Sequence, residues 1–137
     1  MKLCDTSVLV DIDRGGVAER VEKLDAEGRH AISMVTVTEL RLGIELGFEP
    51  ASEAYHDAID GLERLLARFE IIPVSRAVAV DAATIIATLK LRGEPLNDLH
   101  DVNVAATART ERLPVLTANV SHFERIDDLE VIDWTSF

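Results

Sequence analysis

KLCDTSVLVD, residues 2–11, joins two elements of secondary structure within one short stretch. Its first three residues read as a short buried strand, which ends at Asp5. Thr6 and Ser7 offer helix N-cap chemistry, and the apolar segment 8–12 that follows them predicts a helix. A strand that passes directly into a helix is the repeating unit of α/β folds, in which parallel strands alternate with helices.

The same alternation continues to the end of the chain. Four more strands are expected, over residues 31–35, 70–74, 114–117 and 129–132. Helices are expected between them, over residues 17–26, 39–47, 52–69, 76–91 and 98–110, with a short helical turn at 120–125. The pattern predicts an α/β fold, a three-layer sandwich with a central, mostly parallel five-stranded sheet. No linker or internal repeat interrupts it, so we expect a single domain over residues 1–137.

The composition is 47% hydrophobic but only 4% aromatic, which favours helices packed on a sheet over a β-sandwich. Cys4 is the only cysteine, so an internal disulfide and a multi-cysteine zinc site are excluded. Because Cys4 lies in a strand, we expect a buried structural thiol. No apolar run approaches the ~18 residues of a membrane span, and the first residues do not resemble a signal peptide. We therefore expect a cytoplasmic protein with no membrane partner.

The charge is strongly acidic, with 25 Asp and Glu against 14 Lys and Arg and a formal net charge of −11. Such a surface repels nucleic acid over long range. Part of the negative charge can belong to a metal site that is neutralised when the ion binds. Adaptation to high salt is a second explanation, because the screening length falls to about 3 Å at 1 M. Unchanged solubility and activity at low salt would contradict that second explanation.

Several polar residues are expected where strands end or helices begin. Asp5 follows the first strand, and Thr117 and Asn119 close or follow the fourth. Glu39 and Asp101 fall in the first turns of two expected helices. In parallel sheets, ligands bind outside the carboxyl ends of the strands. Carboxylates that face one another there require a cation, and Mg²⁺ prefers oxygen ligands. The pattern predicts an Mg²⁺ or Mn²⁺ site, with helix capping as the alternative role of these acids.

Four segments resemble, in order, the signature blocks of the PIN-domain nucleases: MKLCDTSVLVD, VTVTELRLGIELG, DVNVAATARTERLPVLTANVSHF and LEVIDW. The group they resemble most is VapC-like, the toxin halves of VapBC toxin–antitoxin pairs. The match runs from residue 2 to residue 134 and so covers nearly the whole chain. The resemblance implies a metal-dependent endoribonuclease that cleaves single-stranded or structured RNA. It also implies a homodimer that is silenced by a cognate VapB-like antitoxin.

The resemblance assigns roles residue by residue. Asp5 matches the metal-coordinating aspartate at the end of the first strand, Glu39 the glutamate of the TEL block, and Asp101 the aspartate before the VAATA run. Asn119 lies in the block that reads T.N..DF in the family, where His122 replaces the aspartate. The expected catalytic residues are therefore Asp5, Glu39, Asp101 and Asn119, with Asp5 and Asp101 as metal ligands. The replacement leaves open whether one or two ions bind.

Neighbouring residues have two interpretations each. Asp98 either shares a helix face with Asp101 or caps that helix. Thr6 and Ser7 either cap a helix or place a hydroxyl near a phosphate or a metal-bound water. Thr117 could orient Asn119 or a ligand water. His122 is expected to contact substrate or to be structural, rather than to bind metal.

Other polar residues are expected to lie outside the site. His100 is predicted to lie on the surface, Asp11 and Asp13 on a solvated helix face, and Trp134 in the core. Positive charge for RNA must come from arginines: Arg14, Arg41, Arg76, Arg92, Arg109, Arg112 and Arg125. Arg14 and Arg41 follow segments close to the acids, with surface ion pairing as their alternative role.

Two other functions are compatible with these features. A PIN domain without activity could bind protein or RNA, and loss of metal-dependent cleavage in a folded protein would establish it. An RNA-processing nuclease without an antitoxin is the second, and a neighbouring antitoxin gene or growth arrest on expression would argue against it. The apolar residues of segments 54–69 and 36–47 could contact an antitoxin, or form core.

Overall fold

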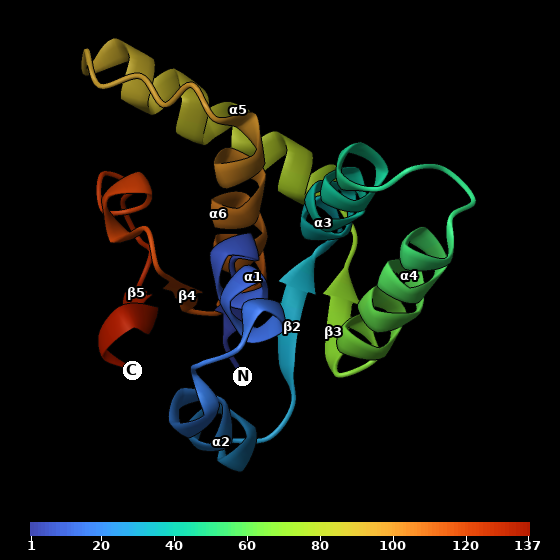
Figure 1. Cartoon of the computed structure of the whole chain (residues 1–137). Helices are drawn as coiled ribbons and strands as arrows, with labels where there is room; N and C mark the ends of the chain where they lie inside the picture. Colours follow the sequence, from blue (N-terminus) through green and yellow to red (C-terminus); the bar gives the residue numbers. More distant parts are fainter.

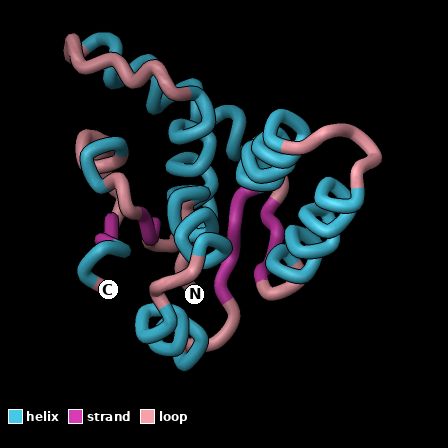
Figure 2. The backbone as a smooth tube through the Cα atoms, viewed as in Figure 1, coloured by secondary structure: helices cyan, strands magenta, loops and turns pink.

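The computed structural model describes residues 1–137 as one α/β arrangement in which helices make up most of the chain (Figures 1 and 2). Its strands are β1 (Leu3–Cys4), β2 (His30–Ser33), β3 (Phe69–Ile72), β4 (Val115–Thr117) and β5 (Val131–Asp133). Its α-helices are α1 (Thr6–Arg14), α2 (Ala18–Ala26), α3 (Met34–Gly47), α4 (Glu53–Leu66), α5 (Arg76–Leu91) and α6 (Leu99–Glu111). Two short 3₁₀ helices follow β4 and β5, namely η1 (Val120–His122) and η2 (Trp134–Ser136).

The five strands form a single sheet in the order β3-β2-β1-β4-β5. Every pairing is parallel, so the predicted α/β class and five-stranded sheet are confirmed. The central strand, β1, lies between β2 and β4. Because all strands run the same way, their carboxyl ends meet at one edge of the sheet, where Asp5 follows β1 and Thr117 ends β4.

Hydrophobic side chains fill both faces of the sheet, as parallel sheets require. Leu3, Ala31 and Val115 belong to the core cluster that contains the buried residues of α5 and α6. The residues that follow each of them, Cys4, Ile32 and Leu116, belong to a second cluster with α1, α4 and Trp134. Since side chains alternate along a strand, the sheet lies between two helical layers, which is the predicted three-layer sandwich.

The structure corrects one element boundary that matters for the site. Residues 31–35 were expected as a strand, but β2 ends at Ser33 and Met34 already begins α3. The Ser33 hydroxyl accepts a hydrogen bond from the Val35 amide at 3.2 Å and caps the helix. The β-branched residues that follow predicted a strand, and helix packing overrides that weak preference. Glu39 therefore lies in the second turn of α3, and its expected place in the first turn was wrong.

The remaining boundaries move by one to three residues, and the expected core residues are buried. Cys4 and Trp134 have no exposed surface, which confirms their structural interpretation. Burial raises the pKa of the Cys4 thiol to about 12, so the thiol is unreactive. The apolar residues of α4 are core at Leu62, Leu65 and Leu66. None of the helices has both the length and the apolar character that a membrane crossing demands.

Candidate active site

A cavity of about 470 Å³ opens at the carboxyl edge of the sheet. All four predicted site residues line it: Asp5, Glu39, Asp101 and Asn119. They come from the ends of β1 and β4 and from helices α3 and α6. Among the other lining residues are two more carboxylates and two basic side chains: Asp11, Asp98, Arg14 and His122. The fold thus gathers five acids that are dispersed along the chain.

Asp5 is 4% exposed and is held by hydroxyl groups. Its Oδ2 accepts hydrogen bonds from Ser7 Oγ and Thr117 Oγ1, each at 2.9 Å. Ser7 Oγ in turn accepts from the Ala118 amide at 3.0 Å, and Thr117 Oγ1 from the Asn119 amide at 2.9 Å. Asp5 Oδ1 receives no hydrogen bond from the protein. The two hydroxyls therefore fix the carboxylate and leave one of its oxygens available.

Asp101 lies in the first turn of α6 and is 8% exposed. Nδ1 of His122 donates to its Oδ2 at 2.9 Å, while Oδ1 receives no hydrogen bond from the protein. Burial, followed by the nearby charges of Asp98 and Asp5, raises the pKa of Asp101 to about 6. His122 lowers it, but by less. Burial and the neighbouring carboxylates therefore disfavour the charged form of Asp101.

Glu39 reaches the cavity from the second turn of α3. Its Oε1 accepts from Thr6 Oγ1 at 2.8 Å, and Thr6 also contacts Thr36 Oγ1 at 3.1 Å. The His100 side chain is 42% exposed, as its predicted surface position implies, but its Nδ1 also lies 3.4 Å from Glu39 Oε2, a contact that was not predicted. The cause is tertiary: α6 packs against α3, and the residue before Asp101 then faces Glu39. Its position next to Asp101 was the only signal in the sequence.

The other residues for which two roles were predicted, helix capping or a role at the site, differ in which role the structure gives them. Asp98 caps α6, because its Oδ1 accepts from the amides of His100 and Asp101 at 2.9 and 3.2 Å. Thr6 and Ser7 hold acids instead of capping α1, since Asp5 itself occupies the N-cap position. These hydroxyls are the part of the site that the sequence left undecided.

Asp11 was wrongly predicted to lie on a solvated face. The indole Nε1 of Trp134 donates to its Oδ2 at 3.1 Å, and Asp11 is only partly exposed, whereas Asp13 is exposed as expected. Trp134 lies 123 residues away in the sequence, so no local pattern could have indicated this contact.

Among the arginines, only Arg14 lines the acidic cavity, and its side chain takes part in no ion pair. Arg41 is paired with Glu45 at 2.9 Å and also donates to the Tyr55 hydroxyl, which confirms its surface role. Arg92 and Arg109 are paired as well, with Asp127 and Asp81. The cavity therefore has one unpaired guanidinium beside its acids.

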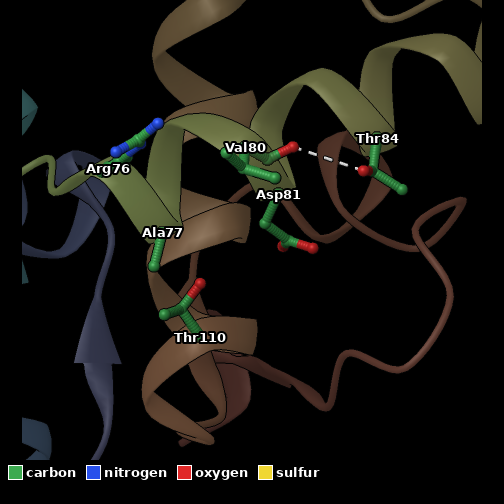
Figure 3. Close-up of a pocket in the computed structure, with 6 residues that line it drawn as sticks. All are labelled: Arg76, Ala77, Val80, Asp81, Thr84 and Thr110. Carbon is green, nitrogen blue, oxygen red and sulfur yellow. Dashed lines mark hydrogen bonds between the residues drawn. The ribbon is translucent and has the colours of Figure 1, made fainter.

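A larger hollow of about 680 Å³ lies between α5 and α6 (Figure 3). Its only acid, Asp81, is paired with Arg109 at 3.0 Å. The dashed line in Figure 3 marks a hydrogen bond within the helix, from the Thr84 hydroxyl to the Val80 carbonyl at 3.3 Å. No group of reactive side chains converges there, so the acidic cavity is the candidate active site.

The donors at this site suit a hard divalent ion. A closed zinc site requires His, Cys, Asp or Glu side chains that together complete the coordination of the ion. The structure contains no group of three or more such side chains that could hold a metal ion. Mg²⁺ keeps several waters and is commonly bound by one or two carboxylates together with substrate phosphate. Asp5 Oδ1 and Asp101 Oδ1 are two such oxygens. The residues present therefore fit Mg²⁺ or Mn²⁺ with water and phosphate completing the coordination.

Comparison with known proteins places the chain in a family. The PIN domain family model matches residues 2–129. Ribonuclease VapC1 of Methanocaldococcus jannaschii is 32% identical over 126 residues, which cover 92% of this chain and 81% of the relative. The solved structure of VapBC-1 from nontypeable Haemophilus influenzae superposes with a TM-score of 0.81 at 28% identity, covering 98% of each chain. VapBC-5 of Mycobacterium tuberculosis, from the VapBC family of toxin-antitoxin systems, gives 0.69 at 26% identity, covering 96% of this chain and 97% of that one. The chain belongs to the PIN-domain family, within its VapC-like group.

Proposed function

We propose that the chain is a divalent-metal-dependent endoribonuclease that hydrolyses phosphodiester bonds of single-stranded or structured RNA. The observation that carries the proposal is the pair Asp5 and Asp101, two buried carboxylates at the carboxyl edge of a PIN fold, each with one unengaged oxygen. A single catalytic PIN domain then spans residues 1–137, with Asp5, Glu39, Asp101 and Asn119 as its catalytic residues.

Asp5 and Asp101 would hold Mg²⁺ or Mn²⁺, whose charge would activate a water and stabilise the leaving oxygen. The chain's own residues do the positioning. The hydroxyls of Ser7 and Thr117 keep Asp5 in one orientation, since both donate to its Oδ2. Thr6 holds Glu39 in place at the cavity by donating to its Oε1.

RNA would enter from the open side of the cavity, where two residues can meet its phosphate. Asn119 is exposed, and its side-chain amide is not hydrogen-bonded within the protein, so its N–H groups can donate to a phosphate oxygen. Arg14 supplies an unpaired guanidinium on the same cavity wall. These two residues offset part of the repulsion between the phosphate and the acids.

The test is RNA cleavage with and without EDTA, in wild type and in two matched variants. We expect EDTA to abolish cleavage, and Mg²⁺ or Mn²⁺ to restore it. Asp5→Asn should lose at least about 100-fold in rate, because a metal ligand is removed. Asp133→Asn is the control: Asp133 also ends a strand at this edge, but its Oδ1 only caps η2 through Thr135. Full activity of Asp5→Asn, or cleavage that resists EDTA, would contradict the proposal.

We also propose that the chain is the toxin of a VapBC pair that acts on cytoplasmic RNA and is silenced by a VapB-like antitoxin. The similarity to VapBC structures over nearly the whole chain supports this role over an RNA-processing nuclease. Expression alone should arrest growth, and co-expression of the neighbouring antitoxin gene should relieve the arrest. Growth that is unaffected by the active nuclease would favour the processing role.

A homodimer is proposed as the assembled form. Helix α5 leaves large apolar side chains exposed, with Val80 at 62%, Ile86 at 38% and Leu91 at 88%. The later part of α5 also projects away from the rest of the molecule (Figure 1). An apolar surface of this kind is typical of protein interfaces. Light scattering after gel filtration should show a dimer for wild type and a monomer for Val80→Glu.

A further inference from the structure

The carboxylate oxygens around the cavity differ in what already occupies them. Glu39 has both oxygens engaged, Oε1 by Thr6 at 2.8 Å and Oε2 by His100 at 3.4 Å. Asp98 Oδ1 is committed to two amides at the start of α6, and Asp11 Oδ2 to the Trp134 indole. Asp98 and Asp11 each keep a second oxygen without a partner, but both side chains are more exposed than those of Asp5 and Asp101.

Asp5 and Asp101 are engaged on one side only. Asp5 uses Oδ2 for Ser7 and Thr117, and Asp101 uses Oδ2 for His122, at 2.9 Å in each case. Asp5 is 4% exposed and Asp101 8%, so both residues are buried. Asp5 Oδ1 and Asp101 Oδ1 are therefore the unpartnered oxygens of the two most buried acids at the cavity.

We propose that the free protein binds one divalent cation, through Asp5 and Asp101, and that His122 prevents a second from binding. The inference rests on the proposed nuclease function and deepens it by assigning the number of ions. Two ions in a shared site lie about 3.5–4 Å apart and need a carboxylate to bridge them or further acids to hold the second. Asp101 is the residue that could bridge, and the N–H of His122 points at the oxygen it would use.

Of the remaining acids, Asp98 is exposed and tied through Oδ1 to the start of α6, and Asp11 is tied through Oδ2 to Trp134. Glu39 stays bonded to Thr6 and paired with His100, and Asn119 offers a neutral amide where a second ion would need charge. A second cation must then displace His122 from Asp101 or arrive with the RNA phosphate. In the free protein neither condition is met, so His122 acts as a positioning residue that limits the site to one ion.

The stoichiometry of Mn²⁺ binding tests the inference without any RNA. Free Mn²⁺ is counted by electron paramagnetic resonance during titration of the full-length protein, and the binding isotherm is confirmed by calorimetry. Wild type should bind one Mn²⁺ per chain, and Asp101→Asn none over the same concentration range. Glu39→Gln should still bind one, because Glu39 is not a direct ligand.

Two variants at residue 122 decide the role of the histidine. His122→Asp replaces the imidazole with a carboxylate and should bind two Mn²⁺ ions, whereas the matched control His122→Asn keeps a side-chain donor without charge and should bind one. Circular dichroism melting confirms that each variant is folded. Two ions in wild type, or one in His122→Asp, would overturn the inference while leaving the nuclease proposal intact. Absence of Mn²⁺ binding together with cleavage that resists EDTA would instead overturn the proposed function.

Discussion

The two edges of the sheet differ in whether their buried polar residues have all their hydrogen-bond partners within the protein. At the edge where the strands begin, His30 is buried at 3% exposure and fully bonded. Its Nδ1 accepts from the Lys2 amide and its Nε2 donates to the Leu24 carbonyl, both at 2.9 Å. The Lys2 ammonium is paired with Glu27. Since both ring nitrogens of His30 are hydrogen-bonded, its burial here contributes stability.

At the edge where the strands end, charge is left without compensation. Asp5 and Asp101 are as buried as His30, yet each keeps an oxygen without a donor. Burial, followed by the charges of Asp98 and Asp5, raises the pKa of Asp101 to about 6, so its charged form is disfavoured in the folded protein. Burial without pairing is thus what distinguishes a binding edge from a structural one in the same sheet.

The largest effect is expected on RNA cleavage, which should depend on Asp101 at one edge and not on His30 at the other. Asp101→Asn is expected to lower RNA cleavage at least about 100-fold, because it removes a metal ligand. His30→Ala should leave cleavage within about twofold of wild type, once rates are corrected for the folded fraction by circular dichroism. Equal loss of activity in the two variants would contradict the division between the edges.

The same two variants should show the opposite order in stability, with His30→Ala being the less stable. His30→Ala removes the partners of two backbone groups and opens a cavity, so the free energy of unfolding should fall by about 2–4 kcal/mol. Urea unfolding in EDTA measures it. A loss below about 1 kcal/mol would mean that water replaces the imidazole and that the hydrogen bonds of His30 contribute little to stability.

Asp101→Asn should make the metal-free protein more stable at pH 7, by about 3 kcal/mol. The pKa of Asp101 is raised from 3.8 to about 6, so the folded protein holds a proton that the unfolded chain releases between these values. The free energy of unfolding of wild type therefore falls as pH rises from about 4 to about 6. Asp101→Asn lacks the titrating group, so its free energy of unfolding should not fall for this reason. Urea unfolding in EDTA at pH 7 and pH 4 checks this, and a gain of equal size at both pH values would contradict it.

The smallest effect is expected at the exposed ion pair of the structural edge. The hydrogen bond from Lys2 lowers the pKa of Glu27, but the Glu27 side chain is one-third exposed. Glu27→Gln should therefore cost no more than about 0.5 kcal/mol, and less in high salt. Chemical denaturation at low and high salt measures it. A loss above about 1 kcal/mol would show that the Lys2–Glu27 pair contributes to the stability of the structure around His30.

Much of the fold was predictable because it depends on local patterns. The strand that ends at Asp5, the alternation of strands with helices, and the first-turn position of Asp101 all follow from short apolar runs and capping residues. The boundary at Ser33 was misplaced because the β-branched run after it favours a strand locally, whereas packing makes it helical. That error put Glu39 one turn too early.

The sequence by itself determined the fold class and three of the acids that face the cavity, Asp5, Glu39 and Asp101, because hydrophobic periodicity and strand ends are encoded within a few residues. Only the tertiary structure decided which oxygens of those acids are occupied. His122 and Asp101 are 21 residues apart, Thr6 and Glu39 33, and Thr117 and Asp5 112. Hydrogen bonds over such separations arise when the sheet and its helices come together, and they leave one oxygen each on Asp5 and Asp101 for a cation.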